Sequence, residues 1–135
     1  YRISPIGKKG SQYPSCWEMP VKSWITRPTD ETGTVKAGKV QIVGVAMGGT
    51  KKVRSVKVSV DGGSSWKKAK FIGPNLGKYA WRQFVLETNL SAGTYNIASL
   101  ASNGGSDKQP ELRMENRRGY AHNGWKDHSV NITVV

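Results

Sequence analysis

An all-β sandwich is the fold class that this sequence predicts, and three observations support it. Short apolar runs of period two recur at the spacing typical of sandwiches. Sixteen Gly and six Pro supply turns between them. No stretch keeps helical spacing over three turns. This pattern fits an immunoglobulin-like antiparallel β-sandwich of about seven strands, although the Cys–Trp–Cys pattern of antibody domains is absent.

The chain divides into an irregular N-terminal arm, residues 1–20, and one domain, residues 21–135. The arm has no periodicity, and Pro5 and Pro14 interrupt any regular element. A length of 135 residues suggests a single domain with a core of its own. The chain starts at Tyr1 without Met or a signal segment, so we expect a fragment of a longer or processed protein.

Seven runs are expected to form strands. One of them, 39–47, is apolar on both faces, which predicts an internal strand covered on both sides. The segment 102–127 is long and irregular, and long loops on a rigid sandwich commonly carry function. The expected strands are 21–27, 39–47, 53–60, 66–71, 81–88, 94–101 and 129–135.

The run 53–60 has the cleanest alternation. Val56 and Val58 are predicted to point to the core, and Lys57 and Ser59 to point away from it. Asp-Gly follows, which supplies the positive-φ residue of a tight hairpin.

The segment 59–66 (SVDGGSSW) matches the Asp-box of sialidases. We interpret it as a hairpin brace, in which the Ser59 and Asp61 side chains accept bonds from turn amides and Trp66 packs beneath. A sialidase would repeat the box around a propeller, and this chain has one copy. The brace therefore predicts structure rather than catalysis.

No catalytic or metal site is predicted from the remaining chemistry-bearing residues. Cys16 is the single cysteine, so an intrachain disulfide or a CxxC site is excluded, and we expect a partly covered, inert thiol. His122 and His128 lack converging ligands for zinc. Two pairs of acidic residues are candidates for acid catalysis, Asp30-Glu31 and Glu111 with Glu115. Neither pair has the apolar setting that raises the pKa of a carboxyl group.

The chain is strongly basic, with 21 Lys and Arg against 9 acids and a net charge of +12. Such a charge attracts anions, acidic proteins, nucleic acid or anionic lipid. No apolar run approaches the ~20 residues that cross a bilayer. One expected basic strip comprises Lys51, Lys52, Arg54, Lys57, Lys67, Lys68 and Lys70. It supports one functional hypothesis, a binding module for acidic glycans or nucleic acid, while a solvated sheet face is the structural alternative.

An ordered set of motifs resembles the dimerisation domain of the sulfite-oxidase family of molybdenum enzymes, over about residues 20–135. The arm and the segment 19–25 (MPVKSWI) resemble the junction between the molybdenum domain and the dimerisation domain, especially the junction found in bacterial sulfite and sulfane dehydrogenases. In order, the motifs are 38–46 (GKVQIVGVA), 53–63 (VRSVKVSVDGG), Trp66, Ala69, 80–84 (AWRQF), Gln109-Pro110, Asn116, Gly119-Tyr120, Asn123 and Trp125.

The resemblance implies a homodimer formed through this domain, and molybdopterin-bound molybdenum in a missing preceding domain. No cofactor is then expected in this chain, and the isolated fragment is expected to be inactive. The family's Asn-x-Arg-Gly stretch implies that Arg118 reaches the sulfite or sulfate oxyanion, since a guanidinium donates two parallel bonds. The alternative for Arg118 is a salt bridge in a domain interface. A periplasmic location and an acidic cytochrome c as electron acceptor are further expectations.

Several motif residues also have structural interpretations. Gly44 is expected where a neighbouring chain passes close, and Trp66 and Trp81 are expected as core anchors. Hydrogen bonds from three loop residues are expected to hold the long loop, and these are Asn116, Tyr120 and Asn123.

Overall fold

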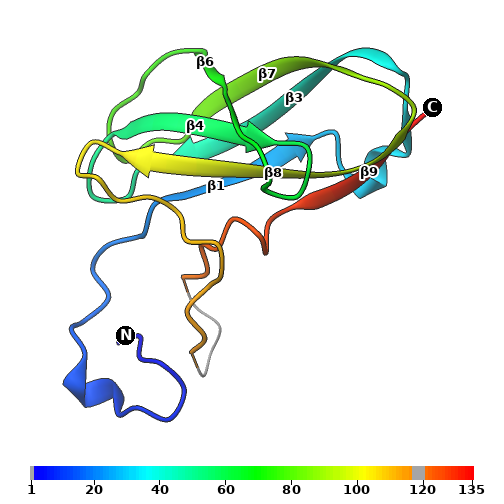
Figure 1. The fold of residues 1–135 in the computed structure, drawn as a ribbon. Helices are drawn as coiled ribbons and strands as arrows, with labels where there is room; N and C mark the ends of the chain where they lie inside the picture. The colour runs from blue at the N-terminus through cyan, green and yellow to red at the C-terminus, as the bar shows by residue number, and fades with distance from the viewer. Residues whose placement is uncertain (1, 117–120) are drawn as a thin grey trace.

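The computed structural model describes residues 2–116 and 121–135. Within these ranges the chain forms nine strands in two sheets and two short 3-10 helices (Figure 1). The strands are β1 (Lys22–Arg27), β2 (Thr34–Val35), β3 (Gly38–Met47), β4 (Val53–Ser59), β5 (Lys67–Lys68), β6 (Lys70–Ile72), β7 (Arg82–Leu90), β8 (Gly93–Asn103) and β9 (Val130–Val134). The helices are η1 (Gly10–Gln12) and η2 (Asp30–Thr32). The predicted all-β sandwich is confirmed.

One sheet has the strand order β1-β3-β7-β6 and the other β2-β9-β8-β4-β5. β3 lies between β1 and β7, as predicted for an internal strand, but on its outer face Lys39 and Gln41 are exposed and Val45 is half-buried. Neighbouring strands are antiparallel except β2 and β9, which are parallel. The sequence did not predict β2, because two residues are too few to show a period.

The core lies between the two sheets, where inward residues of each strand meet. Phe84, Ile42 and Ile97 are fully buried there. A Cβ on Gly44 would clash with both the Phe84 ring and the Trp24 carbonyl oxygen. The expectation that glycine permits a close approach at this position is therefore confirmed. The groups that approach it are the backbone of β1 and the side chain of Phe84.

The predicted strand 66–71 is wrong as a single element. Residues 67–68 pair with β4, whereas residues 70–72 pair with β7 in the opposite sheet. Ala69 is buried at the crossing, and its amide donates to the Val56 carbonyl at 2.9 Å. Because the chain changes sheets there, its side chains divide between two surfaces.

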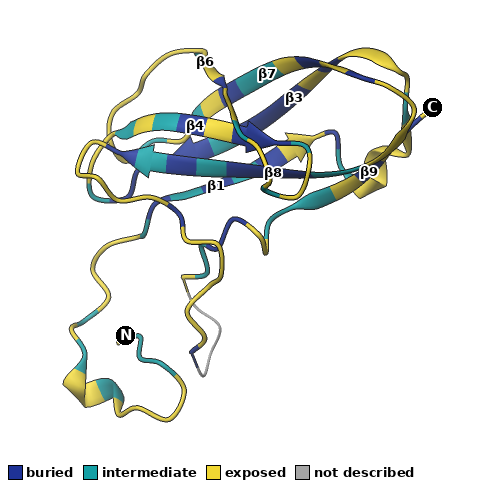
Figure 2. Cartoon of the chain, viewed as in Figure 1, coloured by how far each residue is buried: buried dark blue, intermediate teal, exposed yellow. Residues whose placement is uncertain are grey.

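The arm, residues 2–20, and the described parts of the loop 104–128 lie side by side beyond one end of the sandwich (Figure 1). We call these two segments the extension. A β-bridge joins Pro5 of the arm to Asn116 of the loop. Most residues of the extension are exposed, in contrast to the sandwich interior (Figure 2).

Three expectations about single residues need correction. Trp81 is 40% exposed and no core anchor, because it precedes β7 and lies against Trp24 on the outer side of the sheet. Trp66 is only half-buried, since its partner is Trp125 of the long loop. Cys16 is exposed rather than partly covered, because few residues of the arm pack against the sandwich.

Candidate interaction surfaces

Gln109 attaches the long loop to both sheets and is 1% exposed. Its Oε1 accepts hydrogen bonds from Ser23 Oγ on β1 (2.5 Å) and from the Ala101 amide on β8 (2.9 Å). Its Nε2 donates to the Asn123 carbonyl at 2.9 Å. Ser99 Oγ lies 2.8 Å from Ser23 Oγ and completes the buried network. The start of the loop is thus fixed by side-chain hydrogen bonds in a region that excludes water.

The end of the loop is fixed in the same way. Asn123 Nδ2 donates to the Val21 carbonyl at 3.0 Å, as expected for a residue that holds the loop. The buried Trp125 donates its amide to Pro110 and packs its ring edge-on against Trp66, with 5.0 Å between centroids. The loop therefore returns to β9 in a defined position.

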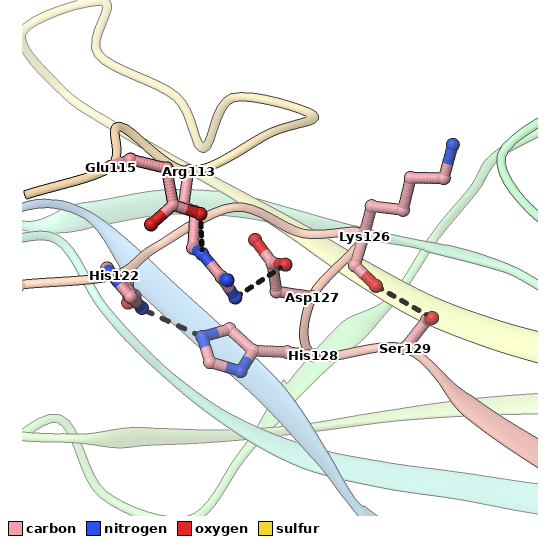
Figure 3. A network of polar contacts seen from close by, with 7 residues as sticks. All are labelled: Arg113, Glu115, His122, Lys126, Asp127, His128 and Ser129. Atoms are coloured by element: carbon pink, nitrogen blue, oxygen red, sulfur yellow. Dashed lines mark hydrogen bonds and ion pairs between the residues drawn. The ribbon is translucent and has the colours of Figure 1, made fainter. Parts of the chain in front are cut away.

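A charged cluster ties the middle of the loop together (Figure 3). Arg113 Nε donates to Glu115 Oε1 at 2.7 Å, and Arg113 Nη1 to Asp127 Oδ1 at 3.1 Å. These two carboxylates raise the pKa of Arg113 further above its usual value. His128 Nε2 lies 3.4 Å from the His122 carbonyl oxygen. Burial lowers the pKa of His128, which favours the neutral ring.

Arg118 and Tyr120 lie outside the described residues. Of their described neighbours, Asn116 is buried and bridges to the arm. Ala121 and His122 line a hollow of about 430 Å³ with Ile3, Cys16, Glu18, Met19, Pro20 and Lys22.

No cluster of three or more His, Cys, Asp or Glu side chains in residues 2–116 and 121–135 could hold a metal ion. No helix in these ranges is long and apolar enough to span a membrane.

The hairpin brace predicted for the segment 59–66 is present. Ser59 Oγ accepts from the Gly63 amide (2.8 Å), and Asp61 Oδ1 accepts from the Ser65 amide (2.9 Å). Hydrogen bonds from Ser65 and Ser59 lower the pKa of Asp61 to about 2. The turn folds over Ser59, so this outward residue is only 1% exposed. The side chains of Ser59, Asp61 and Ser65 are thus all used in hydrogen bonds within the box.

Four residues form a row across the outer face of the four-stranded sheet. Trp24 is opposite Val45, Val45 is opposite Gln83, and Gln83 is opposite Ile72. Directly opposite residues point to the same side of a sheet. Their chain neighbours, such as Ile25 and Phe84, face the core, so the row faces outward.

Trp81, immediately before β7, extends this row, and the segment that joins β6 to β7 begins at the same end of the sheet. The ring centroids of Trp24 and Trp81 are 4.8 Å apart, and Lys22 Nζ lies 5.3 Å from the Trp24 ring. Leu76 and Tyr79, in the segment between β6 and β7, are 74% and 72% exposed. We call this surface the aromatic face, and it comprises Trp24, Val45, Ile72, Leu76, Tyr79 and Trp81.

The structure separates the residues of the predicted basic strip. Lys57 on β4 and Lys68 on β5 are directly opposite each other on the outer face of the five-stranded sheet. Lys67 points the other way, with its Nζ 3.4 Å from Thr88 Oγ1 of the opposite sheet. Lys70 belongs to β6 in that opposite sheet, and Lys51 and Lys52 are exposed before β4.

Lys57 and Lys68 line a hollow of about 540 Å³. We call this hollow the basic groove; its lining residues are Arg54, Ser55, Lys57, Lys68, Ser102, Asn103 and Ser106.

Residues 13–135 match the family model of the molybdenum-cofactor (Mo-co) oxidoreductase dimerisation domain. The chain belongs to this family. The sequence resemblance to the sulfite-oxidase dimerisation domain is thereby confirmed.

Relatives of this dimerisation domain include mitochondrial sulfite oxidases. The chain is 39% identical to the mitochondrial sulfite oxidase of Macaca fascicularis over 130 residues, and 39% identical to that of Homo sapiens over 129 residues. Each match covers 90% of this chain and 23% of the relative. The sulfane dehydrogenase SoxCD of Paracoccus pantotrophus has a similar structure, with a TM-score of 0.67 and 26% identity over 87% of this chain and 33% of that chain. The domain therefore spans about a quarter of the length of these curated relatives.

Sequence reasoning missed two features of this dimerisation domain. It placed Gln109 among the family motifs but not at the junction of the two sheets. It also missed the row that starts at Trp24, although the alternation of Ser23, Trp24 and Ile25 already directs Trp24 away from the core. Knowing which strands are neighbours was needed to see a row across the sheet.

Proposed function

We propose that this dimerisation domain pairs two copies of a molybdenum-cofactor oxidoreductase through its aromatic face. The row from Trp24 to Ile72 across all four strands carries this proposal, because three of its four side chains are apolar and lie on the outer face of a sheet. Trp and Tyr each offer roughly 150–250 Å² for burial, and they are enriched in protein interfaces. A twofold axis through this face would bury the same residues on both copies.

The extension also carries exposed apolar side chains, which suit a contact with the cofactor-bearing domain of the same enzyme. Trp17 is 89% exposed, and Leu112 and Met114 are more than half exposed. The domain thus exposes apolar side chains in two regions, one for each protein contact in this proposal. In this proposal the preceding domain holds molybdopterin and its molybdenum, which supplies two-electron oxidation of sulfite or of sulfane sulfur.

Arg118 is the residue proposed to reach the substrate anion. Its place in the Asn-Arg-Arg-Gly sequence of the family motif supports this role. In the full-length oxidoreductase, Arg118→Gln is expected to raise KM for sulfite and to leave the dimer intact. An unchanged KM would favour the alternative, a salt bridge in the domain interface.

Two further parts of the proposal concern the cellular setting. An acidic cytochrome c is the proposed electron acceptor, and the net charge of +12 supports it by long-range attraction. A periplasmic location is proposed from the resemblance to bacterial dehydrogenases. The comparisons support the assembly role rather than a glycan or nucleic-acid binding module.

Light scattering over a concentration series tests the pairing. The chain is expected to have the mass of a dimer, and Leu76→Glu is expected to weaken association by about tenfold or more, because it places a charge in the interface. Leu112→Glu is the matched control, since Leu112 is similarly exposed but lies on the extension. A monomer at every concentration, or dissociation by Leu112→Glu alone, would contradict the proposal.

A further inference from the structure

The basic groove brings three cationic side chains together on the outer face of the five-stranded sheet. Lys57 and Lys68 are directly opposite on paired strands, and Arg54 lines the same hollow. Like charges at opposed positions of a sheet destabilise the pairing. Folding alone therefore does not explain why these side chains gather in one hollow.

Counter-charges for this groove are scarce in the described part of the chain. The ion pairs found there involve only Arg113 and Lys126, both in the extension. The carboxylate linked to the groove is that of Asp107, whose Oδ2 lies 3.5 Å from Asn103 Nδ2 at the groove margin. The three groove cations thus remain available to an anionic partner.

Neutral donors complete the groove. Ser55 Oγ and Ser102 Oγ lie 2.7 Å apart, and this bond uses one of their two hydroxyl hydrogens. The other hydrogen can be donated to an acceptor in the groove. Ser106, at the groove margin, has a φ of 74°, a left-handed conformation that is costly for serine and is found often at functional sites.

We infer that the basic groove binds a carboxylate-rich segment of a protein partner. Lysine, arginine and hydroxyl donors match carboxylate acceptors. Single-stranded nucleic acid binds on exposed aromatic side chains, and none of the described aromatic residues lines this groove. Exposed Lys51 and Lys52 precede Arg54, so the positive surface is wider than a single small anion needs.

The inference goes beyond the pairing of two copies, because the groove and the aromatic face lie on different sheets. A dimer could therefore bind an acidic partner on each copy. An acidic electron acceptor is one partner of this chemistry, and in that respect the inference rests on the proposed function.

Fluorescence anisotropy of a labelled oligoglutamate peptide, titrated with the 135-residue chain at low salt, tests the groove. Wild type is expected to bind, with an affinity that falls as salt rises. The double variant Lys57→Glu/Lys68→Glu is expected to weaken binding by about tenfold or more, because two attractions become repulsions.

Lys36→Glu/Lys39→Glu is the matched control, since it changes the net charge equally at exposed positions away from β4 and β5. It is expected to weaken binding by no more than about threefold, through long-range charge alone. Circular dichroism and light scattering of the same samples separate a loss of folding or pairing from a loss of peptide binding.

Three results would overturn the inference: no peptide binding by folded wild type, an equal loss in both double variants, or groove-dependent binding of single-stranded DNA in preference to the peptide. The first two mean that the groove has no role of its own. The third assigns it to nucleic acid.

Discussion

Between the sheets, Phe84 and Ile42 are fully buried and few polar groups take part, whereas in the extension Trp17 is almost fully exposed. The extension is fixed by a small number of hydrogen bonds and ion pairs, such as those of Gln109 and Arg113. Figure 2 shows the same contrast in burial. The sandwich is thus held by non-directional apolar packing, while the extension depends on individual polar contacts.

This difference explains why the strands of the sandwich could be predicted, whereas for the extension only its irregular backbone and the role of Asn123 were predicted. Apolar packing leaves a period of two in the sequence, and Val56 and Val58 revealed β4 in this way. Polar attachment leaves no period, so Gln109 gave no signal of its role. The split of 66–71 was missed because tertiary contacts, namely Ala69 with Val56 and Lys70 with Val85, decide the sheet to which each residue belongs.

The candidate site was predictable only in part. The composition showed a basic surface, but the pairing of Lys57 with Lys68, and the turn of Lys67 to the other sheet, follow from strand register. The hairpin brace was predictable because all its partners lie within seven residues of Ser59. Arg118 remains a proposal from the family motif, since it lies outside the described residues.

The largest effect is expected in the sandwich. Phe84→Ala should reduce the free energy of unfolding by roughly 3–5 kcal/mol, because it leaves a cavity between the sheets. Urea denaturation followed by circular dichroism measures it. Ile6→Ala, at a residue 66% exposed in the arm, should change stability little. Similar losses in the two variants would mean that Phe84 is not central to the core.

A smaller effect is expected at the junction of the two regions. Gln109→Leu should cost roughly 1–3 kcal/mol, because the buried amide of Ala101 loses its side-chain acceptor. Limited proteolysis should then cut the segment 104–128 faster than in wild type. Lys108→Leu, at the exposed preceding residue, is the control. Unchanged cleavage in Gln109→Leu would show that other contacts suffice to hold the loop.

A pH effect is expected next, from His128 beside Trp24. Burial places the pKa of His128 below its usual 6.5, so the folded state binds the proton less readily than the unfolded state. Stability is therefore highest above pH 6.5 and decreases as the pH falls below it. Thermal melts at neutral and mildly acidic pH measure this loss, which His128→Phe should reduce. An equal loss in that variant would place the sensitive group elsewhere.

The smallest effect is expected at the exposed hairpin. The pKa of Asp61 is about 2 in the folded state against 3.8 normally, so its stabilisation is complete above pH 3.8 and is lost as the pH falls through 2. Asp61→Asn should abolish this dependence of stability on pH. Asp30→Asn, at an exposed site, should leave it unchanged. NMR titration of the Ser65 amide, which donates to Asp61, follows the change. Retention of the dependence in Asp61→Asn would contradict the brace.

Hydrogen–deuterium exchange at low and high protein concentration tests the central claim, that two copies pair through the aromatic face. The account predicts that amides of residues 72–85 and of β1 become more protected as concentration rises, while those of residues 104–116 do not change. Protection that rises only in the arm and the long loop would contradict the account, because it would place the contact between copies on the extension.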